Sequence, residues 1–254
     1  MVTATAQFLF SQHYCKILHL VRHGQAMHNV EAEKSLEALL SPKLFDAELS
    51  DLGREQVAKL HKRIIASGLL KKIDLVIISP QLRAMQTAVG VFGCEDHMNV
   101  YGLDKCKPPV MVANNLLNAK PALNCCSCPA FLAFEKCRDR MGLRPSDKRR
   151  SVSEYQSIFP SMDFSLMESD EDGLWNPDTR ESYKEIFYRM VEFVEWLWTR
   201  PEKEIVIVSH GVISQFLLYA LENDDPPPSN ETLLSTKRMM DSETDSSATS
   251  TLCG

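Results

Sequence analysis

Cys15–Gly24 (CKILHLVRHG) joins a run of apolar residues directly to an arginine, a histidine and a glycine. Two other apolar runs end in a similar way. Ile73–Ile78 (IDLVII) leads into SPQLR at 79–83, and Ile205–Val208 (IVIV) leads into SHG at 209–211. Short apolar runs rich in β-branched residues predict buried strands. In an open parallel sheet, ligands bind outside the carboxyl ends of the strands. We therefore expect the polar residues that follow these three runs to share one pocket.

The composition is typical of a single α/β domain of ordinary size. The chain has 254 residues, of which 44% are apolar, and its formal net charge is −6. This acidic balance argues against nucleic acid as a partner, which would call for a basic face. No run approaches the roughly 20 apolar residues that cross a bilayer, and the first residues lack the pattern of a secretory signal. We expect a cytoplasmic protein with neither a nucleic-acid nor a membrane partner.

Apolar residues at helical spacing alternate with the expected strands along the chain. We expect helices over 54–67, 81–92, 178–198 and 212–221, and one more short strand over 131–134. Strands that alternate with helices form a parallel sheet covered by helices on both faces. The sequence therefore predicts a three-layer α/β/α fold with a mostly parallel central sheet.

The expected domain covers residues 14–222, after a flexible amino terminus at 1–13. Two stretches without sustained periodicity, near 93–130 and 143–175, read as insertions that shape the pocket. Residues 223–254 are rich in Ser, Thr and acidic residues. Such a composition buries little apolar surface, so we expect a disordered tail with no further strand.

Cysteines cluster in the first insertion, where Cys125, Cys126 and Cys128 lie close together. A structural zinc site usually needs two spaced pairs of ligands, and only one C-x-x-C is present here. A zinc-bearing interaction module is therefore the weaker interpretation, and we expect ordinary thiols and no metal.

The residues after the strands have the chemistry of phosphoryl transfer. Arg22 and Arg83 suit a phosphate because the planar guanidinium binds two oxygens at once. His23 is the candidate nucleophile, since an imidazole with one unprotonated nitrogen can attack phosphorus. His210 is a second imidazole, expected to be protonated and to stabilise the transferring group.

A carboxylic acid would protonate the leaving oxygen. Glu135, at the end of the strand over 131–134, is the candidate, and Asp139 is its nearest rival. Gln25 and Asn29 follow the first motif and could add neutral hydrogen bonds to the substrate. Gly24 would let the backbone approach the phosphate closely.

Four motifs in this order resemble the histidine phosphatase superfamily, which contains the cofactor-dependent phosphoglycerate mutases. They are LVRHGQ at 20–25, LSDLG at 49–53, SPQLRAMQT at 79–87 and VSHG at 208–211. Further stretches are similar to the plant phosphoglycerate mutase-like branch, namely KRRSVSEY at 148–155, FPSMDFSL at 159–166 and WLWTR at 196–200.

The resemblance implies a phosphoglycerate mutase-like fold and a phosphohistidine intermediate at His23. It also implies phosphate binding by Arg22, Arg83 and His210, an acid near Glu135, and neither a metal nor another cofactor. The long insertions do not resemble a mutase signature, so the leading expectation is a phosphatase of small phosphomonoesters. The alternatives are a phosphoglycerate mutase-type isomerase in carbohydrate metabolism, or a catalytically weak or inactive regulatory member of the fold.

Overall fold

The computed structural model describes residues 15–93, 128–227 and 247–253. In these residues one sheet has the strand order β3-β2-β4-β1-β5. Its strands are β1 (Cys15–Arg22), β2 (Leu75–Ile78), β3 (Ala130–Ala133), β4 (Glu204–Ser209) and β5 (Ser247–Cys253). The pairs β1–β4, β4–β2 and β2–β3 are parallel, and β5 runs antiparallel to β1. The mostly parallel sheet predicted from the sequence is confirmed.

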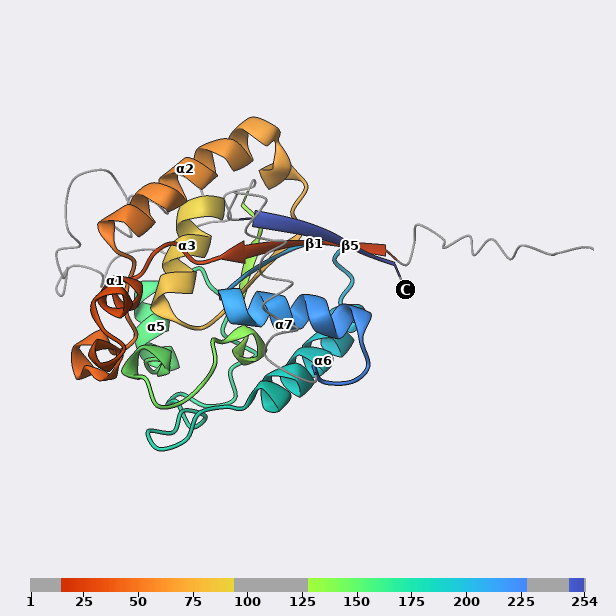
Figure 1. Cartoon of the computed structure of the whole chain (residues 1–254). Coiled ribbons are helices and arrows are strands. Elements are labelled where there is room, and N and C mark those ends of the chain that lie inside the picture. Colours follow the sequence, from red (N-terminus) through yellow and green to blue (C-terminus); the bar gives the residue numbers. More distant parts are fainter. Residues whose placement is uncertain (1–14, 94–127, 228–246, 254) are drawn as a thin grey trace, which may run out of the picture.

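Helices connect these strands (Figure 1). They are α1 (Met27–Lys34), α2 (Asp51–Ser67), α3 (Leu82–Phe92), α5 (Val152–Ile158), α6 (Tyr183–Thr199) and α7 (Gly211–Glu222). The four expected helices are present, and α6 differs most from its predicted bounds. Ser182 caps α6 by accepting the backbone N–H of Glu185, whose side chain reaches back to the Ser182 backbone. This capping box fixes the start of the helix.

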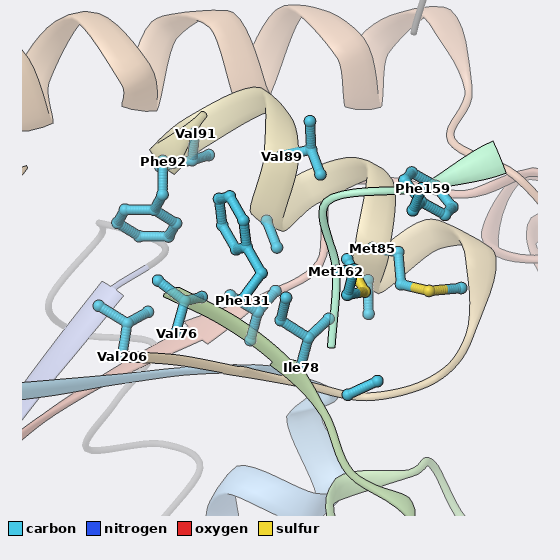
Figure 2. Packing of buried hydrophobic residues seen from close by; sticks show 14 of the residues in the cluster. Val76, Ile78, Met85, Val89, Val91, Phe92, Phe131, Phe159, Met162 and Val206 are labelled. Carbon is cyan, nitrogen blue, oxygen red and sulfur yellow. The ribbon is translucent and has the colours of Figure 1, made fainter. Parts of the chain in front are cut away.

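The sheet separates two apolar cores. Along β2, Val76 and Ile78 face one side while Leu75 and Ile77 face the other, as the alternation of a strand requires. Helices α2, α3 and α5 cover the first side, where Phe131 packs among the residues of Figure 2. Helices α6 and α7 cover the second side. The chain therefore has the three-layer α/β/α fold predicted from the sequence.

Strand β5 differs from the sequence analysis, which expected no strand in residues 223–254. Ser247–Cys253 pairs along the whole of β1, with Val21 opposite Ser247 and Cys15 opposite Cys253. The sequence of this strand, SATSTLC, has no apolar run. Backbone hydrogen bonding to an unpaired sheet edge does not require one. A search for apolar runs could therefore not find this strand.

The remaining domain boundaries stay predictions. The expected flexible segment 1–13 and most of the insertion near 93–130 lie outside the described residues. The second insertion contains the 3₁₀ turn Pro145–Asp147 and helix α5. Within the described ranges, no helix is long and apolar enough to cross a membrane.

Candidate active site

The carboxyl ends of β1, β4 and β2 meet at one edge of the sheet. Arg22, the last residue of β1, pairs with Ser209, the last of β4. The pairing continues beyond the strands, because His23 N donates to Ser209 O at 3.0 Å and Ser79 N donates to Val208 O at 3.0 Å. The polar segments that follow the three strands therefore begin side by side.

His23 lies at this edge with a buried ring that is 6% exposed. Its Nδ1 is 2.7 Å from the carbonyl oxygen of Gly24. A carbonyl oxygen only accepts, so Nδ1 carries the ring proton and Nε2 keeps its lone pair. Burial, with the positive charges of His210 and Arg83, lowers the pKa of His23 well below its ordinary value. His23 is therefore a neutral imidazole with a nucleophilic nitrogen.

Two glycines hold the segment after β1 against the start of α2. A Cβ atom on Gly24 would lie 2.8 Å from the Gly53 carbonyl oxygen, and one on Gly53 would lie 2.0 Å from that of Gln25. On the other side, Gly24 N donates to Thr87 Oγ1 in α3 at 3.1 Å. Close backbone packing thus requires glycine at position 24, a reason that the sequence analysis did not foresee.

His210 caps the start of α7 and is buried next to His23, with 5.0 Å between ring centroids. Its Nε2 is 2.8 Å from Ser79 Oγ, and its Nδ1 is 3.4 Å from Asp139 Oδ2. Burial lowers the pKa of His210 well below its ordinary value, and the charge of Asp139 only partly opposes this. This direction is opposite to the expectation of a protonated His210, because the cost of burying charge outweighs one ion pair.

Arg83 comes from the first turn of α3, as predicted, and is fully buried. Its Nη1 donates to Ser146 O at 2.8 Å. Its Nη2 donates to Gln81 Oε1 at 3.1 Å and to Asp139 Oδ2 at 3.2 Å. Its Nε has no hydrogen-bond partner among the described residues. The guanidinium is therefore fixed in position with one donor unused.

The side chain of Arg22 is exposed and makes no hydrogen bond or ion pair with the residues that the structure describes. Its Cδ and Nε lie 3.6 Å from the place of a Cβ atom on Gly211, at the start of α7. Its charge contributes to the lowered pKa of His210. The structure thus brings Arg22, His23, Arg83 and His210 to one site, as expected from the strand ends.

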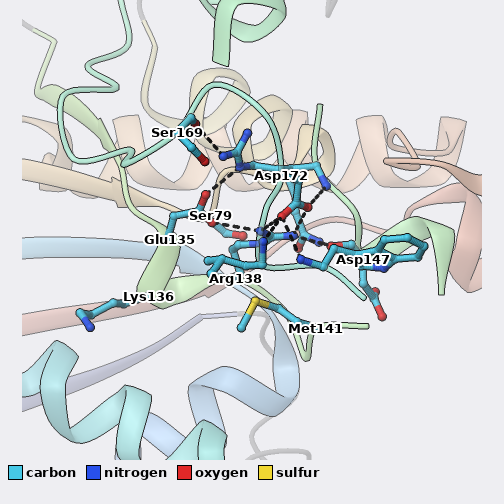
Figure 3. A network of polar contacts seen from close by, with 12 residues as sticks. Ser79, Glu135, Lys136, Arg138, Met141, Asp147, Ser169 and Asp172 are labelled. Carbon is cyan, nitrogen blue, oxygen red and sulfur yellow. Dashed lines mark hydrogen bonds and ion pairs between the residues drawn. The ribbon is translucent and has the colours of Figure 1, made fainter. Parts of the chain in front are cut away.

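The carboxylate of Glu135 forms ion pairs with Arg138 and Arg149. Its Oε2 lies 3.1 Å from Arg138 Nη1, and its Oε1 lies 2.7 Å from Arg149 Nε. Arg138 also binds both carboxylate oxygens of Asp172. Figure 3 shows these groups as one polar network. Within the described residues, no contact joins Glu135 to His23 or to the partners of His23.

Asp139 occupies the place expected for Glu135, since it contacts both His210 and Arg83. Burial alone would raise the pKa of Asp139, but the charges of His210 and Arg83 hold it well below the usual range. Asp147 Oδ1 lies 3.9 Å from the same Arg83 Nη2. Burial and the charge of Asp139 raise the pKa of Asp147 to about 7. The site thus contains two carboxyl groups with opposite shifts.

The two amides predicted to bind substrate have partners within the protein. Gln25 Oε1 accepts from Ser50 Oγ at 2.7 Å. Asn29 Oδ1 accepts from Ala26 N at 2.9 Å, and Asn29 Nδ2 contacts His28 Nε2 at 3.1 Å. Both side chains therefore organise the segment after β1.

Sequence reasoning missed His28. It is the one buried residue of α1, and its ring centroid lies 5.8 Å from that of His23. Helix α1 has no apolar stripe that would have marked its inner face. A polar residue pointing inward from such a short helix leaves no periodic signal.

No group of three His, Cys, Asp or Glu side chains in the described part of the chain could hold a metal ion. Of the cysteine cluster, Cys125 and Cys126 lie outside the described residues.

Comparison with known proteins identifies the family of this chain. The model of the histidine phosphatase superfamily (branch 1) matches residues 18–96 and 160–236. The chain belongs to the histidine phosphatase superfamily.

Curated proteins of Arabidopsis thaliana are similar to most of the chain. A phosphoglycerate mutase-like protein of Arabidopsis thaliana is 50% identical over 213 residues, covering 82% of this chain and 77% of the relative. Phosphoglycerate mutase-like protein 1 of the same plant is 46% identical over 227 residues, covering 89% and 79%. A solved structure described as a putative alpha-ribazole-5'-P phosphatase from Escherichia coli is 17% identical, with coverages of 87% and 84% and a TM-score of 0.49. The resemblance predicted from the motifs, including its plant branch, is confirmed by the curated relatives.

Proposed function

We propose that this protein hydrolyses small phosphomonoesters by transferring the phosphoryl group to Nε2 of His23 and then to water. The observation that carries this proposal is the hydrogen bond from His23 Nδ1 to Gly24 O at 2.7 Å. It aims the ring and leaves Nε2 unprotonated, and the lowered pKa of His23 keeps it so. A neutral, oriented imidazole is what nucleophilic attack on phosphorus requires.

Positive and neutral donors around His23 would stabilise the transferring group. Arg83 has an unused, buried Nε–H, and its position is fixed by its other hydrogen bonds. Arg22 is exposed at the same strand end and can close over the phosphate. The lowered pKa of His210 favours its neutral form in the free site, but a phosphate dianion beside it would raise this pKa and favour the imidazolium. Preorganised donors of this kind are usually the largest contribution to catalysis.

Asp139 is the better candidate for the proton donor than Glu135. Glu135 is held by Arg138 and Arg149, whereas Asp139 contacts Arg83 and His210, the groups that would hold the phosphate. In the free site the positive charge of Arg83 favours the ionised form of Asp139. When a phosphate dianion binds between them, its negative charge raises the pKa of Asp139 and favours proton uptake. The protonated carboxyl can then protonate the leaving oxygen.

A phosphoglycerate mutase-type reaction would use the same intermediate but return the phosphoryl group to a hydroxyl of the substrate. The names of the two Arabidopsis relatives make this the second candidate. The expected cytoplasmic location and role in carbohydrate metabolism stay predictions.

The test is to incubate the full chain with 2- and 3-phosphoglycerate and with a panel of aryl, alkyl and sugar phosphates. We expect release of phosphate and an acid-labile phosphoryl label that is absent from His23→Ala. His61→Ala is the matched control, since His61 lies on α2 and bonds Val91 O. Isomerisation without phosphate release would favour the mutase, and a folded protein that never takes up label would be a regulatory member of the family.

A further inference from the structure

His28 is buried beside the candidate nucleophile and carries no charge. The residue is 7% exposed, and its ring centroid lies 5.8 Å from that of His23. Burial and the nearby positive charge of Arg83 lower its pKa far below the ordinary value. A neutral imidazole has one donor and one acceptor nitrogen, so its role depends on which nitrogen carries the proton.

The hydrogen bonds of Asn29 assign that proton. Asn29 Oδ1 accepts from the backbone N–H of Ala26 at 2.9 Å, which fixes the orientation of the amide. Its Nδ2 therefore faces His28 Nε2, at 3.1 Å. An amide nitrogen can only donate, so Nε2 of His28 is the acceptor. The ring proton of His28 must then be on Nδ1.

This Nδ1–H donor has no partner. His28 Nδ1 is buried and makes no hydrogen bond to any residue that the structure describes. Buried donors are almost always paired, so an unpaired one calls for an explanation. Arg83 and Arg144 act on the ring with positive charge, and the negative charge of Asp139 opposes them. Such surroundings favour an anionic acceptor.

We propose that His28 donates its Nδ1–H to an oxygen of the substrate's phosphoryl group, and that Asn29 is the positioning residue that holds the ring in the required tautomer. This inference rests on the proposed function, because it takes the pocket beside His23 as the phosphate site. Asn29, expected from the sequence to bind substrate, then acts through His28. The neutral donor adds a hydrogen bond without adding a charge to a site that already contains several.

The first experiment measures the tautomer directly. In ¹⁵N-histidine spectra of the full chain, we expect His28 to have a protonated Nδ1 and an unprotonated Nε2. The Nδ1–H resonance should move downfield when inorganic phosphate is added. In Asn29→Ala the ring loses the donor that fixes it, so the proton should distribute over both nitrogens. A wild-type His28 with its proton on Nε2 would overturn the inference, whatever the variants do.

The second experiment measures the affinity for inorganic phosphate by calorimetry, which needs no turnover. His28→Phe keeps a ring but removes the donor, and should weaken binding by about tenfold to a hundredfold, the range for a hydrogen bond to a charged group. His28→Gln keeps a neutral donor and should recover part of the loss. His61→Phe, outside the site, should bind as the wild type does. Unchanged affinity in a folded His28→Phe would overturn the inference.

The test of the role of His28 can fail or succeed independently of the test of the proposed function. If the wild type never labels His23 but binds phosphate in a His28-dependent way, the catalytic proposal fails and the binding role of His28 stands. If the wild type labels His23 and His28→Phe binds phosphate normally, only the role of His28 fails.

Discussion

The Oδ2 atom of Asp139 lies 3.4 Å from Nδ1 of His210. The same carboxylate accepts a hydrogen bond from Arg83 at 3.2 Å. Asp139 therefore joins the segment after β4 to the start of α3.

Asp139→Asn should remove the proton donor while keeping the shape of the side chain. We expect a loss of about 100-fold or more in kcat for alkyl phosphates, whose leaving oxygen needs a proton. p-Nitrophenyl phosphate should lose far less. Glu135→Gln is the matched variant, and it should reduce kcat little but lower the free energy of unfolding by about 1–3 kcal/mol through its bonds to Arg138 and Arg149. Loss of activity in Glu135→Gln that depends on the leaving group would restore Glu135 as the acid.

The two arginines should differ in what they stabilise. Arg22 is exposed and unpaired among the described residues, so Arg22→Ala should change the free energy of unfolding by less than about 0.5 kcal/mol. It should still lower kcat/KM by about 100-fold or more. Arg83→Ala should lower both the free energy of unfolding and kcat/KM, because it removes the buried guanidinium that binds Asp139, at a cost in stability of about 3–5 kcal/mol. Chemical denaturation and steady-state kinetics measure the two effects, and a large loss of stability in Arg22→Ala would contradict the contrast.

Three buried histidines should make the fold sensitive to acid. His23, His28 and His210 have lowered pKa values in the folded protein, so the unfolded chain binds protons that the native state does not. The free energy of unfolding is therefore greatest above about pH 6.5, the pKa of histidine in the unfolded chain, and it falls as the pH decreases below that pKa.

The slope of this loss can be estimated. Each histidine contributes about 1.4 kcal/mol per pH unit, and the raised pKa of Asp147, about 7, offsets one proton because its folded form takes up a proton before the unfolded form does. We expect a net loss of about 3 kcal/mol per pH unit between pH 6 and 5, measured by urea denaturation. His28→Phe should reduce this slope by about 1.4 kcal/mol per pH unit, the contribution of one proton. Stability that stays level or rises over this range would contradict the buried neutral histidines.

The packing of Gly53 should be essential for the site. A Cβ atom there would lie 2.0 Å from the backbone oxygen of Gln25, so Gly53→Ala must displace the segment that carries His23. We expect a loss of stability of about 1–3 kcal/mol together with loss of activity. Gly68→Ala is the control, because Gly68 ends α2 at a φ of 71° with open space around it. It should cost about 1 kcal/mol through backbone strain alone and leave kcat unchanged. Equal activity in the two variants would contradict the packing explanation.

Much of the site could be predicted because it depends on local pattern. Apolar runs mark β1, β2 and β4, and parallel pairing brings their carboxyl ends together whatever the intervening chain does. Arg22, His23 and His210 therefore lie at one edge of the sheet, and Arg83 follows in the first turn of α3.

Other features depend on contacts between distant segments. Glu135 and Asp139 are four residues apart, and the sequence offered no reason to separate them. The fold directs Glu135 to Arg149 and Asp139 to Arg83, because each carboxylate binds the cation that packing places beside it. The antiparallel strand β5 likewise depends on the free edge of β1.

The sequence by itself determined the family, the order of strands β1 to β4 and of helices α2, α3, α6 and α7, and the four residues that meet at the strand ends, since motif and hydrophobic period are properties of the chain. Only the tertiary structure decided that Asp139 contacts Arg83 and His210, which histidines have lowered pKa values, and that His28 has an unpaired donor beside His23. Protonation and hydrogen-bond partners are set by burial and by neighbouring charges, and those exist only once the chain has folded.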